Sequence, residues 1–242
     1  MKKNYYKINI SRIIQELKNE DVEDDKDGKD NEEETSDEQK LQLPDYGSPE
    51  FWEKRYKIEF LPFDWYLQWN ELEPAISSYI TSDKEHLKSL VIGCGNSTMS
   101  NDMVEKSGYK NIVSIDISAS VIEKMKHRYK NENLEWIQMD VADMKFQNDS
   151  FDLIFDKGTI DALTCSNDAN LVIRNSSNEL YRVLKPNGFL FMITFEKPIY
   201  RIPLMIHTKV PWKIETVLFI PNKSNQKDDD PGTYVYLFQK SN

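Results

Sequence analysis

From residue 87 onward, short apolar runs alternate with longer segments whose apolar residues recur every three or four positions. The short runs suit β-strands, and the longer segments suit helices that cover them. The strand-like runs are Leu87–Ile92, Asn111–Asp116, Leu134–Met139, Phe151–Phe155 and Phe189–Phe195. Three stretches are helix-like. The first is residues 97–107, the second begins after Ser118, which can cap it, and extends to about Tyr129, and the third is longer and reaches Leu184. Runs that are apolar throughout are typical of central parallel strands with helices on both faces.

The end of the chain departs from this alternation. Residues 212–220 and 233–239 predict two further strands, and the polar loop between them is too short for a crossover helix, so the pair should be antiparallel. The Lys-Pro-Asn-Gly sequence at residues 185–188 indicates a turn. The predicted fold is therefore α/β: a Rossmann-like, doubly wound, mostly parallel seven-stranded sheet with a C-terminal antiparallel hairpin. In such a sheet the ligand crevice lies beyond the carboxyl ends of the strands, where the strand order reverses.

The first 42 residues differ in composition from the rest. Near-helical spacing of Ile8, Ile13, Ile14 and Leu17 allows one short helix over residues 7–18. Residues 20–38 hold twelve acidic and two basic side chains, whereas the remaining chain has 29 of each. This run should be disordered because it has almost nothing apolar to bury, and it is either a solvated extension, which we favour, or a partner-binding tail. The charge balance elsewhere argues against a protein built to capture nucleic acid.

A glycine-containing loop follows the first strand-like run. Its sequence, Gly93-Cys94-Gly95-Asn96-Ser97, permits a tight turn and a close approach of a ligand to the backbone. A full dinucleotide fingerprint has a third glycine near position 98, where this chain has Thr98, so NAD and FAD are disfavoured. Taken alone, the loop is equally consistent with an ordinary strand–helix turn.

The next two strands each end in an aspartate. Asp116 can accept two hydrogen bonds from a ribose diol, as the acidic residue of nucleotide-binding βαβ units does. At Asp140-Val141, a side-chain acceptor stands beside a backbone N–H, which together match the exocyclic amine and a ring nitrogen of adenine. No P-loop sequence occurs, which disfavours a triphosphate. S-adenosylmethionine fits these three loops best as a cofactor.

Two further segments can complete such a site. The fourth run ends in Asp156-Lys157-Gly158 and continues to Asp161, which places charged groups where a methyl donor and its acceptor would meet; a capped helix start is the alternative. Upstream, residues 46–69 contain nine aromatic side chains among 24. They can pack under the sheet edge, or fold over the crevice as a lid in which a sulfonium gains cation–π stabilisation of roughly 0.5–2 kcal/mol.

Metal and membrane chemistry receive little support from the sequence. The two cysteines and three histidines have no ligand-like spacing, so we expect no metal site. No apolar run is long enough to span a bilayer, and the chain starts without a signal-peptide pattern. A reducing, cytoplasmic location is the expectation.

Several motifs resemble the class I, seven-strand S-adenosylmethionine-dependent methyltransferases. These are FWEKRY and FDWY at 51–66, LVIGCGNSTMS at 90–100, SIDIS at 114–118, MDVADM at 139–144, FDLIFDKGTIDAL at 151–163 and RVLKPNGFLFMIT at 182–194. Within that family the chain is similar to the subgroup containing translation elongation factor 1-alpha lysine methyltransferase 4 and methyltransferase-like protein 13. The resemblance implies a methyltransferase domain over residues 43–242, made of an aromatic lid segment (43–86) and a Rossmann-like core (87–242), behind an acidic extension at 1–42.

The resemblance also implies particular cofactor contacts. They are Trp52, Tyr56 and Trp65 in the aromatic segment, Gly93 in the first loop, Asp116 and Ile117 at the ribose, Asp140 and Val141 at the adenine, and Lys157 after the fourth strand. To these we add Gly95 as the second glycine of the loop. The chain departs from the wider family at Val91, where an acidic residue often stands, and at Ser97, where a third glycine is usual.

The expected reaction is methyl transfer to the amine of a protein lysine, with elongation factor 1-alpha as the substrate that the resemblance implies. Asp156 and Asp161 are candidates for orienting that amine, which must be neutral to react. An NPPY-like tetrapeptide is absent after the fourth strand, which disfavours adenine or glutamine amide acceptors. The alternatives are a methyltransferase for a small molecule or another protein, and a cofactor-binding scaffold without catalysis.

Overall fold

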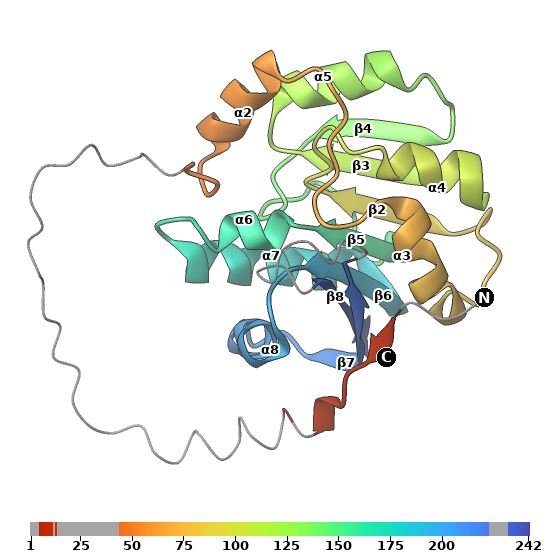
Figure 1. Ribbon diagram of the computed structural model, residues 1–242, viewed down its shortest axis with the longest axis vertical. Coiled ribbons are helices and arrows are strands. Elements are labelled where there is room, and N and C mark those ends of the chain that lie inside the picture. The colour runs from red at the N-terminus through yellow and green to blue at the C-terminus, as the bar shows by residue number, and fades with distance from the viewer. Residues whose placement is uncertain (1–4, 12, 14–43, 223–231) are drawn as a thin grey trace, which may run out of the picture.

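The computed structural model describes residues 5–11, 13, 44–222 and 232–242, which form one eight-stranded sheet with helices on both faces (Figure 1). Across the sheet the strand order is β1-β7-β8-β6-β5-β2-β3-β4. The strands are β1 (Tyr6–Lys7), β2 (Lys88–Ile92), β3 (Asn111–Asp116), β4 (Leu134–Gln138), β5 (Phe151–Lys157), β6 (Leu184–Thr194), β7 (Trp212–Pro221) and β8 (Gly232–Lys240).

The strand directions confirm the predicted fold class. Strands β2 to β6 pair in parallel, whereas β8 is antiparallel to β6 and β7. The order reverses between β2 and β5, where Ile92 lies opposite Asp156. The loops that follow these two strands therefore emerge side by side at the switch point of the sheet, where a ligand crevice is expected.

Helices cover both faces of the sheet. They are α2 (Pro49–Ile58), α3 (Trp69–Ile76), a 3₁₀ turn (Ser77–Tyr79), α4 (Met99–Ser107), α5 (Ala119–Arg128), α6 (Thr159–Leu163), α7 (Ala169–Val183) and α8 (Pro198–His207). In β2, Val91 belongs to the apolar cluster that includes α3, α4 and α5, while Leu90 and Ile92 belong to the cluster of α7 and α8. Alternate residues of a strand point to opposite faces, so this central strand must be apolar throughout.

Local signals set where the helices begin and end. Ser118 caps α5 by accepting a hydrogen bond of 3.3 Å from the Val121 N–H, as its position predicts. At the end of α4, Gly108 adopts a left-handed conformation with φ of 79°, which stops the helix.

Three features differ from the sequence-based expectations. The expected turn at residues 185–188 lies within β6, where the register against β5 shifts, and Asn187 has a φ of 64°. Helix α8 was not predicted, because Pro198 and Pro203 obscure its pattern. Tyr6 and Lys7 form an eighth strand against β7, so the helix predicted from residue 7 starts later. Its residues 12 and 14–18 lie outside the described residues, as does the acidic run at 20–38.

The aromatic segment crosses the carboxyl-terminal edge of the sheet. Its helix α2 packs on α5, and the chain then returns over the ends of β2 and β5 before α3 begins (Figure 1). Among the described residues, no helix is both long and apolar enough to cross a membrane.

Candidate functional site

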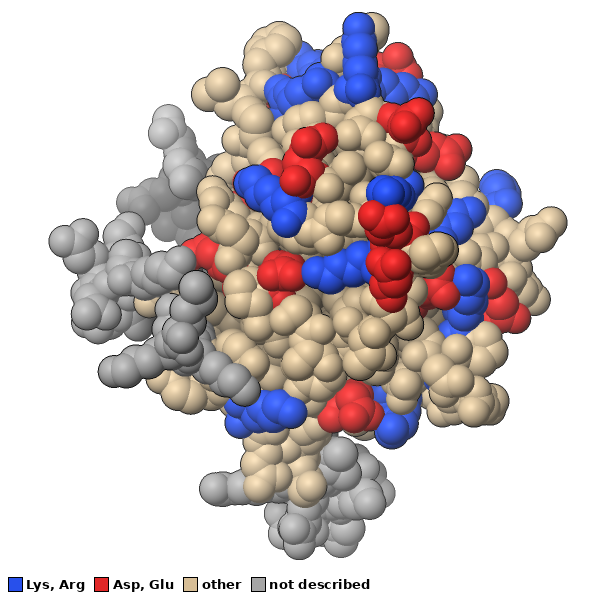
Figure 2. All heavy atoms as spheres, turned by 90° about the vertical axis from the view of Figure 1, so that its right-hand side faces the viewer, with Lys and Arg blue, Asp and Glu red and all other residues tan. Residues whose placement is uncertain are grey.

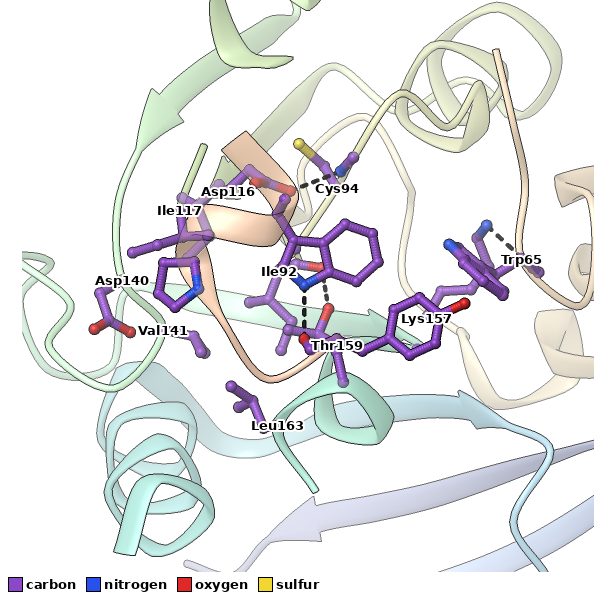
Figure 3. A pocket seen from close by; sticks show the side chains of 18 of the residues that line it. Trp65, Ile92, Cys94, Asp116, Ile117, Asp140, Val141, Lys157, Thr159 and Leu163 are labelled. Carbon is purple, nitrogen blue, oxygen red and sulfur yellow. Dashed lines mark hydrogen bonds between the residues drawn. The ribbon is translucent and has the colours of Figure 1, made fainter. Parts of the chain in front are cut away.

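A cavity of about 340 Å³ opens beyond the carboxyl ends of β2, β3, β4 and β5. This volume lies within the roughly 300–1,000 Å³ range of small-molecule sites. The ten residues predicted to bind cofactor all line it: Trp52, Tyr56, Trp65, Gly93, Gly95, Asp116, Ile117, Asp140, Val141 and Lys157. In Figure 3, Ile117, Asp140 and Val141 lie at one end of the cavity, and Trp65 and Lys157 lie at the other. Asp156 and Asp161 are not among the lining residues.

The two glycines of the first loop are required by close packing. Gly93 has a φ of 49°, and a Cβ atom there would lie 2.1 Å from the Thr159 hydroxyl oxygen. Gly95 has a φ of 51°, and its Cβ would lie 2.5 Å from the Tyr56 hydroxyl oxygen. L-residues avoid this region of backbone conformation, and both neighbours leave no space for a side chain. The loop can therefore present its bare backbone to a ligand.

Asp116 is a buried carboxylate at the edge of the cavity. Its Oδ2 accepts a hydrogen bond of 2.9 Å from the Gly95 N–H, and its Oδ1 accepts one of 2.9 Å from the Ser118 N–H. Burial raises the pKa of Asp116 to about 6, although the two backbone hydrogen bonds oppose this shift. Each carboxylate oxygen retains a second acceptor position, so the group suits a ligand that brings two hydroxyl donors.

Asp140 and Val141 follow β4 and line the same cavity. Asp140 Oδ1 accepts a hydrogen bond of 2.8 Å from the Ala142 N–H, which holds the turn after β4. Val141 is buried and Ile117 lies nearby, so a planar ring would rest between aliphatic side chains (Figure 3).

At the opposite end, Lys157 and Asp64 form a buried ion pair. Their Nζ–Oδ1 distance is 2.8 Å, and the two side chains are only 7% and 9% exposed. Burial lowers the pKa of Lys157 despite the opposing effect of Asp64. Asp64 also accepts hydrogen bonds from Ser97 Oγ and, at 3.3 Å, from the Thr98 N–H. This one carboxylate therefore joins the aromatic segment to both the glycine loop and the end of β5.

Aromatic rings form the remaining wall. The rings of Trp52 and Tyr56 stack with centroids 5.8 Å apart, and Trp52 Nε1 donates a hydrogen bond of 2.8 Å to the Tyr46 carbonyl. Tyr46 in turn contacts Trp65 edge-on at 6.0 Å. Burial raises the pKa of Tyr56 well above its usual range, so its hydroxyl stays protonated. The predicted lid is thus a packed aromatic wall.

Helix α2 is fixed to α5 by one carboxylate. Glu53 accepts hydrogen bonds of 2.6 Å from Ser118 Oγ and 2.5 Å from Ser120 Oγ. These two hydroxyls, with the Ser120 N–H, lower the pKa of Glu53 to about 2. The wall that carries Trp52 and Tyr56 is therefore attached directly to the loop that follows Asp116.

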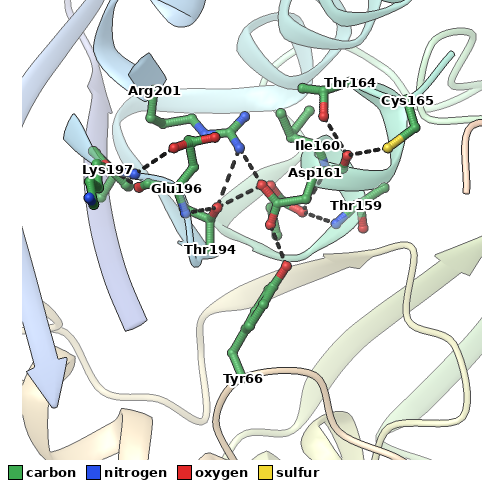
Figure 4. Close-up of polar contacts among 12 residues, drawn as sticks. Tyr66, Thr159, Ile160, Asp161, Thr164, Cys165, Thr194, Glu196, Lys197 and Arg201 are labelled. Carbon is green, nitrogen blue, oxygen red and sulfur yellow. Dashed lines mark hydrogen bonds and ion pairs between the residues drawn. The ribbon is translucent and has the colours of Figure 1, made fainter. Parts of the chain in front are cut away.

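The two carboxylates proposed to orient an amine lie behind the wall. Asp156 Oδ1 accepts hydrogen bonds from the N–H groups of Thr159 at 2.9 Å and Ile160 at 3.4 Å, so it caps α6. Burial, then the nearby Asp161, raises the pKa of Asp156 to about 7. Asp161 accepts hydrogen bonds from Tyr66, Thr194 and Arg201 (Figure 4).

Sequence reasoning missed several residues at this site. Asp64 lies inside the FDWY motif but was not singled out, and Gly47 packs so closely that its Cβ would lie 2.5 Å from the Ser166 nitrogen. Arg201 is only 2% exposed in the otherwise apolar helix α8. A lone arginine in an apolar stretch was the available signal for a buried partner, because an unpaired buried charge is costly.

Comparisons with known proteins point to one family. A family described as Methyltransferase domain matches residues 83–229, which is more than half of the chain. The eEF1A lysine and N-terminal methyltransferase of Bos taurus is 35% identical over 149 residues, covering 60% of this chain and 21% of that protein. The chain thus spans about one fifth of that relative's length. The EEF1A lysine methyltransferase 4 of Mus musculus is 27% identical over 180 residues, covering 70% of this chain and 69% of that protein.

A solved structure supports the fold. The SAM-dependent methyltransferase from Methanosarcina mazei superposes with a TM-score of 0.55 and 18% identity, covering 74% of this chain and 99% of that one. At this identity the similarity concerns the arrangement of strands and helices alone.

Proposed function

The chain belongs to the methyltransferase domain family, and from this premise we propose that it transfers a methyl group to the side-chain amine of a protein lysine. The family match confirms the class I methyltransferase resemblance, and the enzyme class and the S-adenosyl-L-methionine cofactor follow from it. The lysine acceptor is supported by the names of two relatives. One observation carries the proposal: the cavity at the switch point places a buried aspartate, two bare glycines and an aromatic wall around one ligand-sized space.

We assign the cofactor contacts by their chemistry. Asp116 accepts hydrogen bonds from the ribose diol. The Asp140 side chain and the backbone N–H at Val141 bind the exocyclic amine and a ring nitrogen of adenine. Trp52, Tyr56 and Trp65 enclose the sulfonium and the methionine portion, next to Lys157. The fit is supported by Asp116, whose two oxygens are each engaged once and retain acceptor capacity toward the cavity.

The residues of this chain contribute mainly positioning. When bound, S-adenosylmethionine supplies a methyl group on a sulfonium, which is already a good leaving group. The aromatic wall excludes water and favours the neutral form of an incoming lysine amine, because burial disfavours the ammonium. Asp156 holds the start of α6, and Asp161 holds Tyr66. We therefore assign both carboxylates to positioning the wall.

Elongation factor 1-alpha is the substrate that we propose first, because two relatives carry its name in theirs. A cytoplasmic location is part of this proposal. A different protein or a small-molecule acceptor would leave the cofactor assignments unchanged.

The test is methyl transfer from radiolabelled S-adenosylmethionine to purified elongation factor 1-alpha by the full chain. We expect labelled lysine in the substrate with the wild type, and at least about a hundredfold less with Asp116→Ala. Asp83→Ala, which removes an exposed carboxylate that does not line the cavity, should retain activity. Cofactor binding without labelling of this or any protein in a cell extract would overturn the proposed acceptor.

A further inference from the structure

Residues 58–63, here named the apolar loop, expose an unusual amount of apolar surface. Ile58 is 78% exposed, Phe60 69%, Leu61 78% and Phe63 42%. Exposed apolar residues that occur singly need no explanation, but a contiguous cluster marks a binding surface. These four large side chains lie within six residues, from the last residue of α2 to a residue that lines the cavity.

The backbone of the apolar loop is held in place although its side chains face water. Lys124 Nζ donates a hydrogen bond of 3.0 Å to the Glu59 carbonyl, and Asn96 Nδ2 donates one of 2.6 Å to the Leu61 carbonyl. Arg128 donates to the Phe60 carbonyl between them. Three successive carbonyls are thus bound by side chains from α5 and the glycine loop. A surface fixed in this way loses less conformational entropy when a partner binds.

The apolar loop is continuous with the cavity. Phe63 lines the cavity and contacts Trp65 edge-on, with ring centroids 5.1 Å apart. Between them, Asp64 is fixed by its ion pair with Lys157 at 2.8 Å. If a macromolecule binds Phe60 and Leu61, the residues of that macromolecule next to the contact would therefore lie at the entrance of the cavity.

The surroundings of the apolar loop are basic. Four cations lie on or against it: Arg55 and Lys57 are ion-paired with Glu59 and Glu53, whereas Lys124 and Arg128 donate hydrogen bonds to its backbone carbonyls and leave a net positive charge there. Outside residues 20–38 the chain as a whole, in contrast, has equal numbers of acidic and basic side chains, 29 of each. In Figure 2, Lys and Arg side chains gather at the upper end of the molecule, the end at which α5 lies in Figure 1.

We infer that the apolar loop is the docking surface for the protein substrate, and that it recognises an apolar patch bordered by acidic side chains near the target lysine. This inference rests on the proposed function and adds to it the means by which the acceptor protein is selected. The apolar side chains supply the desolvated centre of the interface, and the positive charges of Lys124 and Arg128 beside it favour an acidic border. A small-molecule acceptor has no use for this surface.

The test compares two double variants of the full chain, with purified elongation factor 1-alpha as acceptor. Phe60→Ser/Leu61→Ser removes the centre of the apolar loop. The control, Tyr6→Ser/Ile206→Ser, removes one aromatic and one aliphatic side chain that are 63% and 56% exposed, on β1 and α8. We expect the first variant to raise the KM for the protein about tenfold or more, with an unchanged S-adenosylmethionine affinity by calorimetry and an unchanged melting temperature. The control should match the wild type.

Each other outcome has a distinct meaning. If the wild type methylates the protein and both double variants have its KM, the docking inference is wrong while the proposed function stands. If the loop variant loses cofactor affinity in parallel with activity, the loop belongs to the cofactor site and the inference is again wrong. If the wild type methylates no protein, the proposed function fails and the inference fails with it.

Discussion

The phenolic hydroxyl of Tyr66 donates a hydrogen bond of 2.8 Å to Asp161, which joins the aromatic segment to helix α6. Tyr66 adopts a left-handed conformation with φ of 63°, which is unfavourable for an aromatic residue. Asp64, on the other side of Trp65, forms an ion pair with Lys157, so both sequence neighbours of Trp65 are fixed by side-chain contacts. The position of Trp65 in the cavity wall therefore depends on contacts made by residues on either side of it.

Removing the Tyr66 anchor should weaken cofactor binding. We expect Tyr66→Phe to lower the affinity for S-adenosylmethionine about three- to tenfold. A hydrogen bond to a charged group contributes about 1.5–3 kcal/mol, and only part of that energy holds Trp65 in position. Isothermal titration calorimetry measures this directly. Tyr200→Phe, which removes an exposed hydroxyl, serves as control. Equal affinities for both variants would exclude the anchoring role.

Arg201 should be required for stability. Its guanidinium is buried against Asp161, and Arg201→Met would leave that carboxylate without its cation. Breaking a buried pair costs about 3–5 kcal/mol of unfolding free energy. Urea denaturation should show this loss, whereas the exposed Arg174→Met should change stability by less than about 0.5 kcal/mol. A small effect at Arg201 would mean that Asp161 is neutral in the folded protein.

The second glycine of the loop should not tolerate a methyl group. Gly95→Ala forces a Cβ atom to 2.5 Å from the Tyr56 hydroxyl at a φ of 51°. We expect a loss of more than tenfold in cofactor affinity, since the loop or the aromatic wall must move. The control is Gly108→Ala, because Gly108 has a φ of 79° and open space where a Cβ would lie. This variant therefore has the backbone strain of about 1 kcal/mol without a steric clash. Its cofactor affinity should equal that of the wild type.

Cofactor affinity should depend on pH through Asp116. Burial raises its pKa to about 6, and two hydroxyl donors from a ribose favour the ionised form. Binding therefore releases a proton below pH 6, and affinity should fall as the pH falls, approaching tenfold per pH unit. The affinity of Asp116→Asn, which cannot ionise, should be weak and flat over the same range. A wild-type profile that is flat from pH 5 to pH 8 would contradict this role.

Stability should depend on pH through Asp156. Its pKa is raised from 3.8 to about 7, so the folded state binds this proton more tightly than the unfolded state. The resulting stabilisation is complete below pH 3.8 and is lost as the pH rises through 7. Asp156→Asn keeps an oxygen that can cap α6 and lacks the charge, so its advantage over the wild type in urea denaturation should grow between pH 5 and pH 8. The opposite trend would mean that the Asp156 pKa is lowered.

Much of the cofactor cavity could be predicted from local patterns. Apolar runs followed by Gly93, Asp116 and Asp140 identify strands and the loops after them. Parallel strands all end at the same edge of a sheet. We can therefore predict that these loops meet, although the sequence does not give the distances between them. The antiparallel hairpin of β7 and β8 followed from the length of its connection in the same way.

Contacts between distant segments could not be predicted. The pair of Asp64 with Lys157 and the bond from Tyr66 to Asp161 join residues 93 and 95 positions apart. Local periodicity cannot show whether Asp161 faces the cavity or the buried Arg201 behind it. The short β1 is identified by its pairing with β7, which propensity over two residues does not predict.

The sequence by itself thus determined the fold class, the central strands and the loops that line the cavity, since hydrophobic periodicity and turn chemistry are local properties. Only the tertiary structure decided which carboxylates line the cavity and which support its wall, and that the side chains of Ile58, Phe60 and Leu61 remain largely in water. Burial and ion pairing depend on what the rest of the chain brings alongside each residue, and that is a property of the folded molecule.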